Sequence, residues 1–321
     1  MKDFSYYIKK YLTIYLKEKI NASDNCIQSY RDTFKLLLLF YKDELKLNIS
    51  ELNYESFSLA NIDLFINWLK TNRNSSLTTC NQRLACLKSF SKYLIYELPE
   101  MLPELQKIIL KQQAKVLKEE LSFLSIEEVK SILNKPNQNT KKGLKELVIL
   151  SILYDTGVRI NELINLSLND IRLGEISTIK VLGKGNKYRT IPISDNLKIL
   201  LSQYINKFNI TTGILFKSNQ NKKYTSNGIR YIISKYTKEI NFKVTPHTFR
   251  HSKASHLVEA NVPLIYIRDL LGHEHVSTTE IYAKVNLKTK NQILNQSSNL
   301  ECKTSNSWNK NNELMEWLNN L

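Results

Sequence analysis

All five histidines of the chain fall between His247 and His275, and this segment is the first place to look for chemistry. His247 and His251 stand four residues apart, a spacing that puts two metal ligands on one face of a helix. Arg250 lies between them, three residues after His247 and on the same face. A guanidinium group repels a metal cation but donates paired hydrogen bonds to an oxyanion. The segment HTFRH therefore favours phosphate over metal.

Four further motifs supply the groups that break a phosphodiester bond without a metal. They are TGVRINEL with Arg159, LGKGNK with Lys184, LGH with His273 and STTEIYAKV with Tyr282. Arginines neutralise the nonbridging oxygens as negative charge builds up in the transition state. A tyrosine is a nucleophile that stores the broken bond as a phosphotyrosine. A histidine can take the phenolic proton, and a lysine can protonate the leaving hydroxyl group.

The spacing of apolar residues predicts helices and one hairpin as the scaffold for these side chains. Helical spacing is found over residues 5–20, 26–45, 61–70, 76–98, 145–157, 159–166, 195–208, 226–240, 247–260 and 263–271. Residues 175–193 resemble two strands around a turn that contains Gly and Asn. Ser125 with Glu128, and Ser277 with Glu280, form capping boxes that begin helices. We expect a mainly α fold with a small antiparallel sheet.

Prolines and charge divide the chain into four regions. Residues 1–103 are predicted to form a helical domain that ends at a pair of prolines, and the lysine-rich residues 104–119 a linker. Residues 120–285 carry all the motifs above and are predicted to form the catalytic domain. Residues 286–321 are a polar tail that ends in the amphipathic segment NELMEWLNNL. A helix that short is marginal alone, so we expect it to dock on a partner.

In order and local context, TGVRINEL, LGKGNKYRTIPI, HTFRH, LLGH and STTEIYAKV resemble the motifs of the tyrosine recombinase (phage integrase) family, including Xer-like recombinases. The resemblance covers the catalytic half, about residues 120–285. It extends more loosely to SYRDTFKLLLLFYK and TTCNQRLACLKSFSKYL, which look like the helical core-binding (SAM-like) DNA-binding domain of that family. HSKASHL departs from the commoner HTFATHL without touching a catalytic position. We associate that variant with mobile-element integrases.

The resemblance implies a role for each motif residue. Arg159 and Arg250 would bind the scissile phosphate, and His273 would hydrogen-bond to it. Lys184 would act as general acid toward the 5′-hydroxyl group, and His247 would assist proton transfer. All of these side chains would then converge on one backbone linkage of the DNA.

Tyr282 would be the nucleophile and would leave a 3′-phosphotyrosine. That bond conserves the energy of the broken linkage, so the resemblance implies neither ATP nor a metal nor another cofactor. It further implies a dimer on inverted half-sites, a tetramer holding two duplexes, and strand exchange through a Holliday junction. The terminal helix would pack into the neighbouring protomer. Chromosome dimer resolution, mobile-element integration or excision and gene inversion all fit, with or without a partner recombinase or accessory protein.

Structural roles are the alternatives for the same side chains. Tyr282 is one of 17 tyrosines, and isolated helical tyrosines more often pack in a core. Arg159 could pair with Glu162 at i+3 on the surface, a contact worth about 0.3 kcal/mol. Lys184 could be a solvated turn residue. Structural or DNA-adjacent positions are expected for the remaining histidines: His251, His256 and His275.

The excess of positive charge indicates an anionic partner. Lys and Arg total 46 against 30 Asp and Glu, a net charge of +16, which fits nucleic acid, a ribosomal role included, or an anionic membrane surface. No apolar run reaches the ~18 residues that cross a bilayer, and the first residues do not resemble a signal peptide. Cysteines without a CxxC pair indicate a reducing compartment, and we expect the cytoplasm. Four residues on segments that the family uses against DNA are candidate DNA contacts: Arg83, Lys88, Lys187 and Arg189.

Three other functions share part of these features. A metal-dependent nuclease would use the histidine cluster, but carboxylates are scarce there and Arg250 is embedded in it. A DNA-binding protein without catalysis would not need the complete residue set. A type IB topoisomerase would share the chemistry but usually lacks site specificity. We therefore expect a site-specific recombinase that acts on double-stranded DNA.

Overall fold

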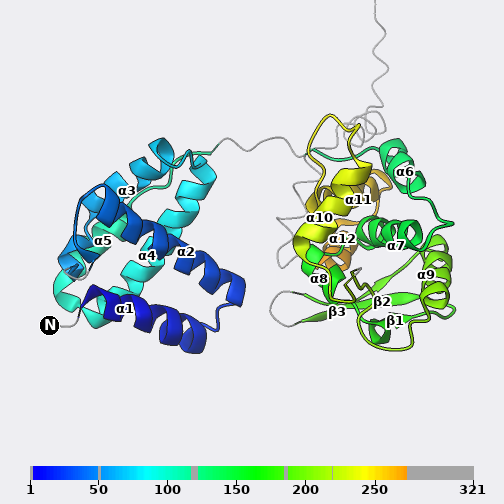
Figure 1. Ribbon diagram of the computed structural model, residues 1–321, viewed down its shortest axis with the longest axis horizontal. Coiled ribbons are helices and arrows are strands. Elements are labelled where there is room, and N and C mark those ends of the chain that lie inside the picture. Colours follow the sequence, from blue (N-terminus) through cyan, green and yellow to red (C-terminus); the bar gives the residue numbers. More distant parts are fainter. Residues whose placement is uncertain (1–2, 50–51, 117–121, 184–186, 219, 273–321) are drawn as a thin grey trace, which may run out of the picture. The chain divides into compact units, whose positions relative to one another are not determined.

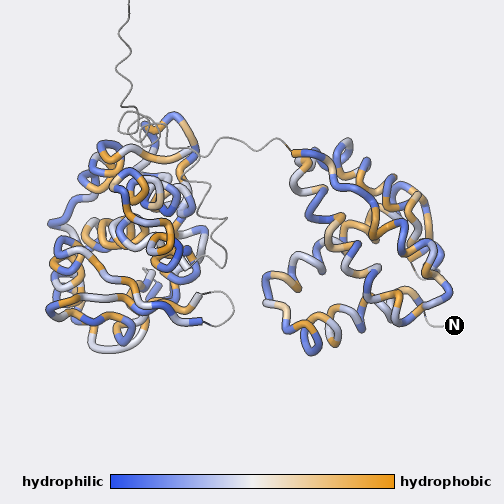
Figure 2. Tube along the Cα trace, turned by 180° about the vertical axis from the view of Figure 1, so that it is seen from behind, coloured by the Kyte–Doolittle hydropathy of each residue, from blue (hydrophilic) through white to orange (hydrophobic). Residues whose placement is uncertain are grey.

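The computed structural model describes residues 3–49, 52–116, 122–183, 187–218 and 220–272. The chain divides into two compact units, residues 1–119 and 120–321, and each is described by itself (Figure 1). Hydrophobic and hydrophilic positions are interspersed along the helices of both units (Figure 2), as expected where one face of a helix is buried. No helix in the described ranges is long and apolar enough to span a membrane.

The described part of the N-terminal unit is helical. Its elements are α1 Phe4–Lys10, the π-helix η1 Tyr11–Lys19, α2 Asp24–Asp43, the 3-10 helix η3 Tyr54–Ser56, α3 Leu59–Thr71, α4 Leu77–Glu97, the 3-10 helix η4 Pro99–Met101 and α5 Leu102–Leu110. Ser23, Ser58 and Ser76 cap α2, α3 and α4, because each hydroxyl group accepts a hydrogen bond from an amide in the first turn. The helix expected over residues 5–20 begins as α1 and continues as the π-helix.

Aromatic rings form the centre of this unit. The ring centroid of Phe90 on α4 lies 4.9 Å from Phe34, 5.1 Å from Tyr11 and 5.3 Å from Phe57. All four side chains are buried. The rings meet edge to face, an arrangement that their quadrupoles favour. These contacts hold η1, α2 and α4 together.

α5 extends the first unit past residue 103, where we expected a linker to begin. Leu105 and Ile108 are fully buried and belong to the same core as Phe90. They lie three residues apart and so on one face of the helix. The lysine-rich composition hid this apolar stripe because Lys107, for example, is exposed on another face. Residues 104–110 therefore belong to the first unit and not to a linker.

The C-terminal unit combines helices with a three-stranded antiparallel sheet of order β1-β2-β3. Its elements are α6 Ile126–Asn134, α7 Lys141–Thr156, α8 Ile160–Asn165, the 3-10 helix η5 Leu168–Asp170, β1 Ile171–Arg172, β2 Thr178–Leu182, β3 Tyr188–Pro192, α9 Asp195–Phe208, α10 Ser226–Tyr236, α11 Pro246–Glu259 and α12 Leu264–Leu271. The expected hairpin pairs Ile179 with Ile191. β1, too short to be recognised from a sequence pattern, adds to its edge through Ile171. The predicted mainly helical fold with a small antiparallel sheet is confirmed.

α7 is the central helix of this unit. α6, α8, α9 and α11 all pack against it (Figure 1). Its residues are buried around most of the circumference, which is typical of a helix enclosed by others. α7 ends at Thr156 and is capped by Gly157, whose φ is 59°, and α8 begins after Arg159. A β-carbon at Gly157 would lie 2.5 Å from Leu271 Cδ2, so both the conformation and the space require glycine there.

Several segments far apart in the sequence meet at the end of α12. α11 packs against α7 and α12, and α12 also packs against β3. α12 ends at Leu271, and Gly272 caps it with a φ of 66°. The turn between α7 and α8, strand β3 and helix α11 are thereby brought to the C-terminal end of α12.

Candidate active site

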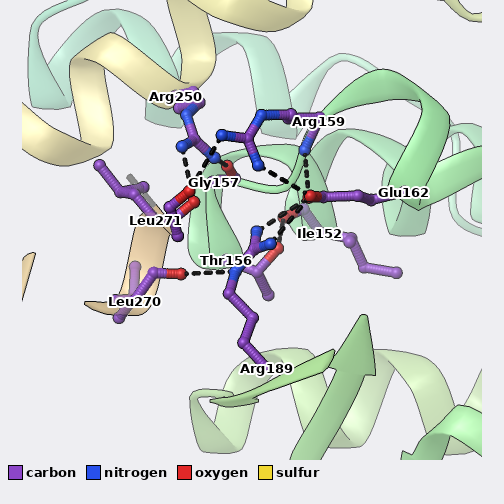
Figure 3. A network of polar contacts seen from close by, with 10 residues as sticks. Ile152, Thr156, Gly157, Arg159, Glu162, Arg189, Arg250, Leu270 and Leu271 are labelled. Carbon is purple, nitrogen blue, oxygen red and sulfur yellow. Dashed lines mark hydrogen bonds and ion pairs between the residues drawn. The ribbon is translucent and has the colours of Figure 1, made fainter. Parts of the chain in front are cut away.

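Half of the six predicted catalytic residues lie in described parts of the chain: Arg159, His247 and Arg250. Arg159 immediately precedes α8, and His247 and Arg250 lie in the first turns of α11. The structure brings both arginines to the end of α12 (Figure 3). The other three fall outside the described residues: Lys184, His273 and Tyr282.

The two arginines hold neighbouring carbonyl groups at the end of α12. Arg250 is 3% exposed. Its Nη2 donates to the Leu271 carbonyl at 2.6 Å, and its Nη1 donates to the Gly157 carbonyl at 2.7 Å. Arg159 Nη2 donates to the Gly272 carbonyl at 3.0 Å. Because the last carbonyl groups of a helix have no partner inside the helix and carry partial negative charge, guanidinium groups stabilise them.

A buried carboxylate links these arginines to the sheet. Glu162 on α8 has a side chain only 4% exposed. Arg189 on β3 binds it with both Nη1 and Nη2 at 2.8 Å, a bidentate pair. Arg159 donates to the same carboxylate from its backbone amide at 2.8 Å and from Nη1 at 3.0 Å. The i+3 pair of Arg159 and Glu162 foreseen from the sequence exists, but it is part of a buried network and not a surface contact.

Electrostatics keep the Glu162 carboxyl ionised. Burial alone would raise its pKa, but hydrogen bonds from Arg189 and from the backbone of Arg159, together with the charge of Arg189, bring the pKa below the ordinary value. The network therefore carries two positive groups around one buried negative group. That excess of positive charge suits an anionic ligand.

Arg189, which we predicted to contact DNA, lies within this network, and DNA contact by it stays a prediction. Its side chain is 13% exposed, and its Nε donates to the Leu270 carbonyl at 3.1 Å. The alternation of β3 carried the signal, because Arg189 stands two residues before the buried Ile191 and so shares its face.

The histidines of α11 remain neutral near pH 7. His247 is exposed, yet partial desolvation and the positive charges of Arg250 and Arg159 lower its pKa. The ring of His251 lies 6.2 Å from that of His247, and burial, His247 and Arg250 lower its pKa to about 4. A neutral imidazole at position 247 can accept a proton. In the described part of the chain, no group of three or more His, Cys, Asp and Glu side chains could hold a metal ion.

His256 lies apart from this cluster in a structural contact. Its Nδ1 is 2.9 Å from the hydroxyl group of Tyr154 on α7, and burial lowers its pKa. The side chain is almost fully buried between α11 and α7. The contact ties these two helices together.

The candidate DNA contacts differ in how they are placed. Arg83 Nη1 donates to the Ser29 carbonyl and to Thr33 Oγ1, both at 3.0 Å, so this group joins α4 to α2. Lys88 is half-buried, and burial and the charges of neighbouring lysines lower its pKa. Lys187 is exposed next to β3. DNA contact by these residues stays a prediction.

The model of the phage integrase family matches residues 122–289 of the chain. The chain belongs to the phage integrase family. The matched range includes the sequence positions of all six predicted catalytic residues, those outside the described ranges among them. The resemblance noted from the motifs is thereby confirmed, and the chain is a site-specific tyrosine recombinase that cuts and rejoins DNA strands.

The similarity of this chain to known recombinases extends over nearly its whole length. It is 30% identical over 315 residues to the putative integrase/recombinase y4rC of Sinorhizobium fredii, covering 95% of each chain. It is also 30% identical over 297 residues to the tyrosine recombinase XerD of Staphylococcus haemolyticus, covering 90% of this chain and 97% of that protein. The relationship therefore includes the N-terminal unit as well as the catalytic half.

Solved structures share the fold of this recombinase. One is the XerH site-specific recombinase bound to difH substrate, with a TM-score of 0.66 and 21% identity over 90% of this chain and 84% of that one. Another is the Tn1549 transposon integrase in complex with transposon right end DNA, with a TM-score of 0.65 and 18% identity over 90% and 98%. At these identities the likeness concerns the fold alone.

Proposed function

We propose that this tyrosine recombinase cleaves DNA by attack of Tyr282 on a phosphate that Arg159 and Arg250 hold. The observation that carries the proposal is the convergence of both guanidinium groups on the end of α12. His273 follows that end directly in the sequence, and Tyr282 follows nine residues later. A protein that only bound DNA would have no need to concentrate these groups around one helix terminus.

The two arginines differ in solvent exposure, and this difference supports a different role for each in binding the phosphate. The Arg159 side chain is 32% exposed, so a phosphate can reach it from solvent. Arg250 is buried and keeps its positive charge in a site of low dielectric constant. Charge that develops on the nonbridging oxygens would be stabilised strongly there, because the donors are already oriented before the reaction.

Proton transfer is assigned to the remaining motif residues. His247, neutral near pH 7, would take the phenolic proton of Tyr282, and Lys184 would protonate the leaving 5′-hydroxyl group. His273 would donate a hydrogen bond to the phosphate. The tyrosyl linkage conserves the energy of the broken bond, so the 5′-hydroxyl group of another strand can reverse the step without ATP.

The assembly follows from the same proposal. Two protomers would bind inverted half-sites of a duplex, and a tetramer would hold two duplexes while strands exchange through a Holliday junction. The helix predicted from the sequence over residues 312–321, which lie outside the described residues, would pack into the neighbouring protomer. The protein would act in the cytoplasm on chromosomal or mobile-element DNA, with or without a partner recombinase or an accessory protein. Several relatives named XerC and XerD support a role of this kind.

The test is covalent capture on a nicked duplex. Binding sites are first selected from random duplexes with the full chain, and a nick placed near the cleavage position traps the phosphotyrosine. We expect a denaturant-resistant protein–DNA adduct with wild-type protein and with Tyr266→Phe, a control at an exposed tyrosine of α12. Tyr282→Phe should form none, and an adduct that persists in that variant contradicts the assignment.

Chelators and supercoiled plasmids distinguish the rival activities. Adduct formation should be unchanged by a chelator, whereas chelator-sensitive cleavage with free ends would indicate a metal-dependent nuclease. Relaxation of any supercoiled plasmid, regardless of sequence, would indicate a topoisomerase. Site-selective binding without an adduct would indicate a DNA-binding protein that performs no chemistry.

A further inference from the structure

Three consecutive carbonyl groups at the end of α12 are each held by a different arginine (Figure 3). The pairs are Leu270 with Arg189 Nε at 3.1 Å, Leu271 with Arg250 Nη2 at 2.6 Å and Gly272 with Arg159 Nη2 at 3.0 Å. The arginines come from β3, α11 and the start of α8, so one helix end gathers three separate elements. The function proposed above assigns a role to only two of these arginines, Arg159 and Arg250.

Arg189 faces the protein with its whole guanidinium group. Both terminal nitrogens are committed to Glu162, and Nε is committed to the Leu270 carbonyl. The side chain is 13% exposed, against 32% for Arg159. All three donor nitrogens of Arg189 thus have partners inside the protein, and these contacts point to a role in holding the site together.

Glu162 transmits the position of Arg189 to Arg159. Its Oε1 accepts from both Arg189 Nη1 and Arg159 Nη1, and its Oε2 accepts from both Arg189 Nη2 and the Arg159 backbone amide. The carboxylate has a buried side chain and can turn only if these bonds break. With Arg189 removed, only the hydrogen bonds from Arg159 would orient the Glu162 carboxylate.

Arg189 also fixes the end of α12 by direct packing. A β-carbon on Gly272 would lie 3.0 Å from both Cδ and Nη1 of Arg189. The guanidinium group therefore lies against the backbone of the residue that precedes His273 in the sequence. Any shift of Arg189 changes both the position of Arg159 and the point from which the chain continues toward Tyr282.

We propose that Arg189 is a positioning residue for the recombination reaction, which holds the Arg159 guanidinium group through Glu162 and the end of α12 through the Leu270 carbonyl. The proposal rests on the function proposed for Arg159. It assigns to Arg189 an effect on the rate of cleavage and not on DNA affinity. A displacement of about 1 Å at a reacting group can cost roughly 100-fold in rate.

The experiment measures adduct formation in a single turnover at saturating nicked duplex, together with the dissociation constant and the melting temperature. Arg189→Lys keeps a positive charge near Glu162 but loses the fork and the Nε contact. We expect it to react about 100-fold more slowly, with a melting temperature and a DNA affinity close to those of wild type. Arg172→Lys, a matched change at an exposed arginine of β1, should leave the rate unchanged.

A double-mutant cycle with Arg159→Ala shows whether Arg189 acts through Arg159. The double variant should lose less than the product of the two single losses, because the route from Arg189 through Glu162 to Arg159 is already absent. Independent, multiplicative losses overturn the proposal. So does a weaker DNA affinity with a salt slope reduced by about 0.9, which marks a phosphate contact. A wild-type rate per folded molecule also overturns it and leaves Arg189 with a purely structural role.

The proposed function can fail separately from this inference. If Arg159→Ala forms the adduct as fast as wild type, the role given to Arg159 is wrong, and the route from Arg189 through Glu162 loses its purpose. If Arg159→Ala is slow while Arg189→Lys reacts at the wild-type rate, only the positioning role is wrong. Should Arg189→Lys not fold, Arg189→Gln supplies the same comparison with a planar, uncharged donor.

Discussion

His251 lies one turn beyond His247 on α11 and next to the buried Arg250. Burial and the positive charges around it lower its pKa to about 4, against an ordinary value of 6.5. The folded protein therefore keeps this imidazole neutral over a pH range in which the unfolded chain protonates it. A group that binds a proton only in the unfolded state lowers stability as the pH falls.

This difference predicts how stability responds to acid. Between pH 6.5 and about 4, the free energy of unfolding should fall as pH falls, by at most about 1.4 kcal/mol per pH unit from this one group. His251→Gln removes the titration, so its melting temperature should fall less than that of wild type between pH 6.5 and 5. The pKa values of His247 and His256 are lowered too, so a smaller dependence should remain. Identical slopes for the two proteins would contradict the prediction.

At the scale of elements, the end of α12 combines a left-handed cap with a cluster of positive charge. Gly272 adopts a φ of 66° and lies directly against Arg189. A larger residue at position 272 would therefore cost free energy in two ways: through the left-handed backbone conformation and through the contact with Arg189. Gly213 offers a comparison, because its φ is 80° but a β-carbon added to it would meet nothing within 4 Å.

Alanine at these two glycines separates the costs. Gly213→Ala should lower the free energy of unfolding by about 1–2 kcal/mol, the cost of the left-handed conformation for a residue with a side chain. Gly272→Ala should lower the free energy of unfolding by about 1–3 kcal/mol more than Gly213→Ala does, because its methyl group must displace Arg189. It should also slow adduct formation. Urea unfolding of both variants measures the difference, and equal losses would show that Arg189 moves aside at no cost.

At the scale of the whole molecule, charge dominates the expected behaviour toward DNA. The chain carries a net charge of +16. Binding that neutralises six to ten phosphates should weaken roughly 10³–10⁵-fold between about 50 and 200 mM salt, because counterions are released on association. Lys88, whose pKa is lowered by burial and by the neighbouring Lys92 and Lys111, stands in a locally positive part of the first unit.

Titrations of duplex DNA over this salt range test the contribution of Lys88. Lys88→Ala should reduce the slope of log K against log salt by about 0.9, the value for one phosphate contact. Lys107→Ala is the control, since that lysine is paired with Glu104 on α5. A slope unchanged by Lys88→Ala, with only a uniform loss of folding stability, would remove Lys88 from the DNA-binding residues.

The family and most helices could be predicted from the sequence. Motif order predicted Arg159 and Arg250 as site residues, and local periodicity predicted α7, α9 and α11 as well as the hairpin, because apolar spacing and caps act over a few residues. The end of the first unit was predicted too early in the sequence, because the many lysines around α5 made its apolar, buried face hard to recognise.

The partners of those motif residues depend instead on contacts between distant parts of the chain. The bonds from Arg189 to Leu270, from Arg250 to Gly157 and from Arg159 to Gly272 join residues 81, 93 and 113 positions apart. No local pattern encodes such pairs, because they depend on how α7, α11, α12 and the sheet pack. The burial of Glu162 arises in the same way, and it turns a pair that would be weak in water into the centre of a charged network.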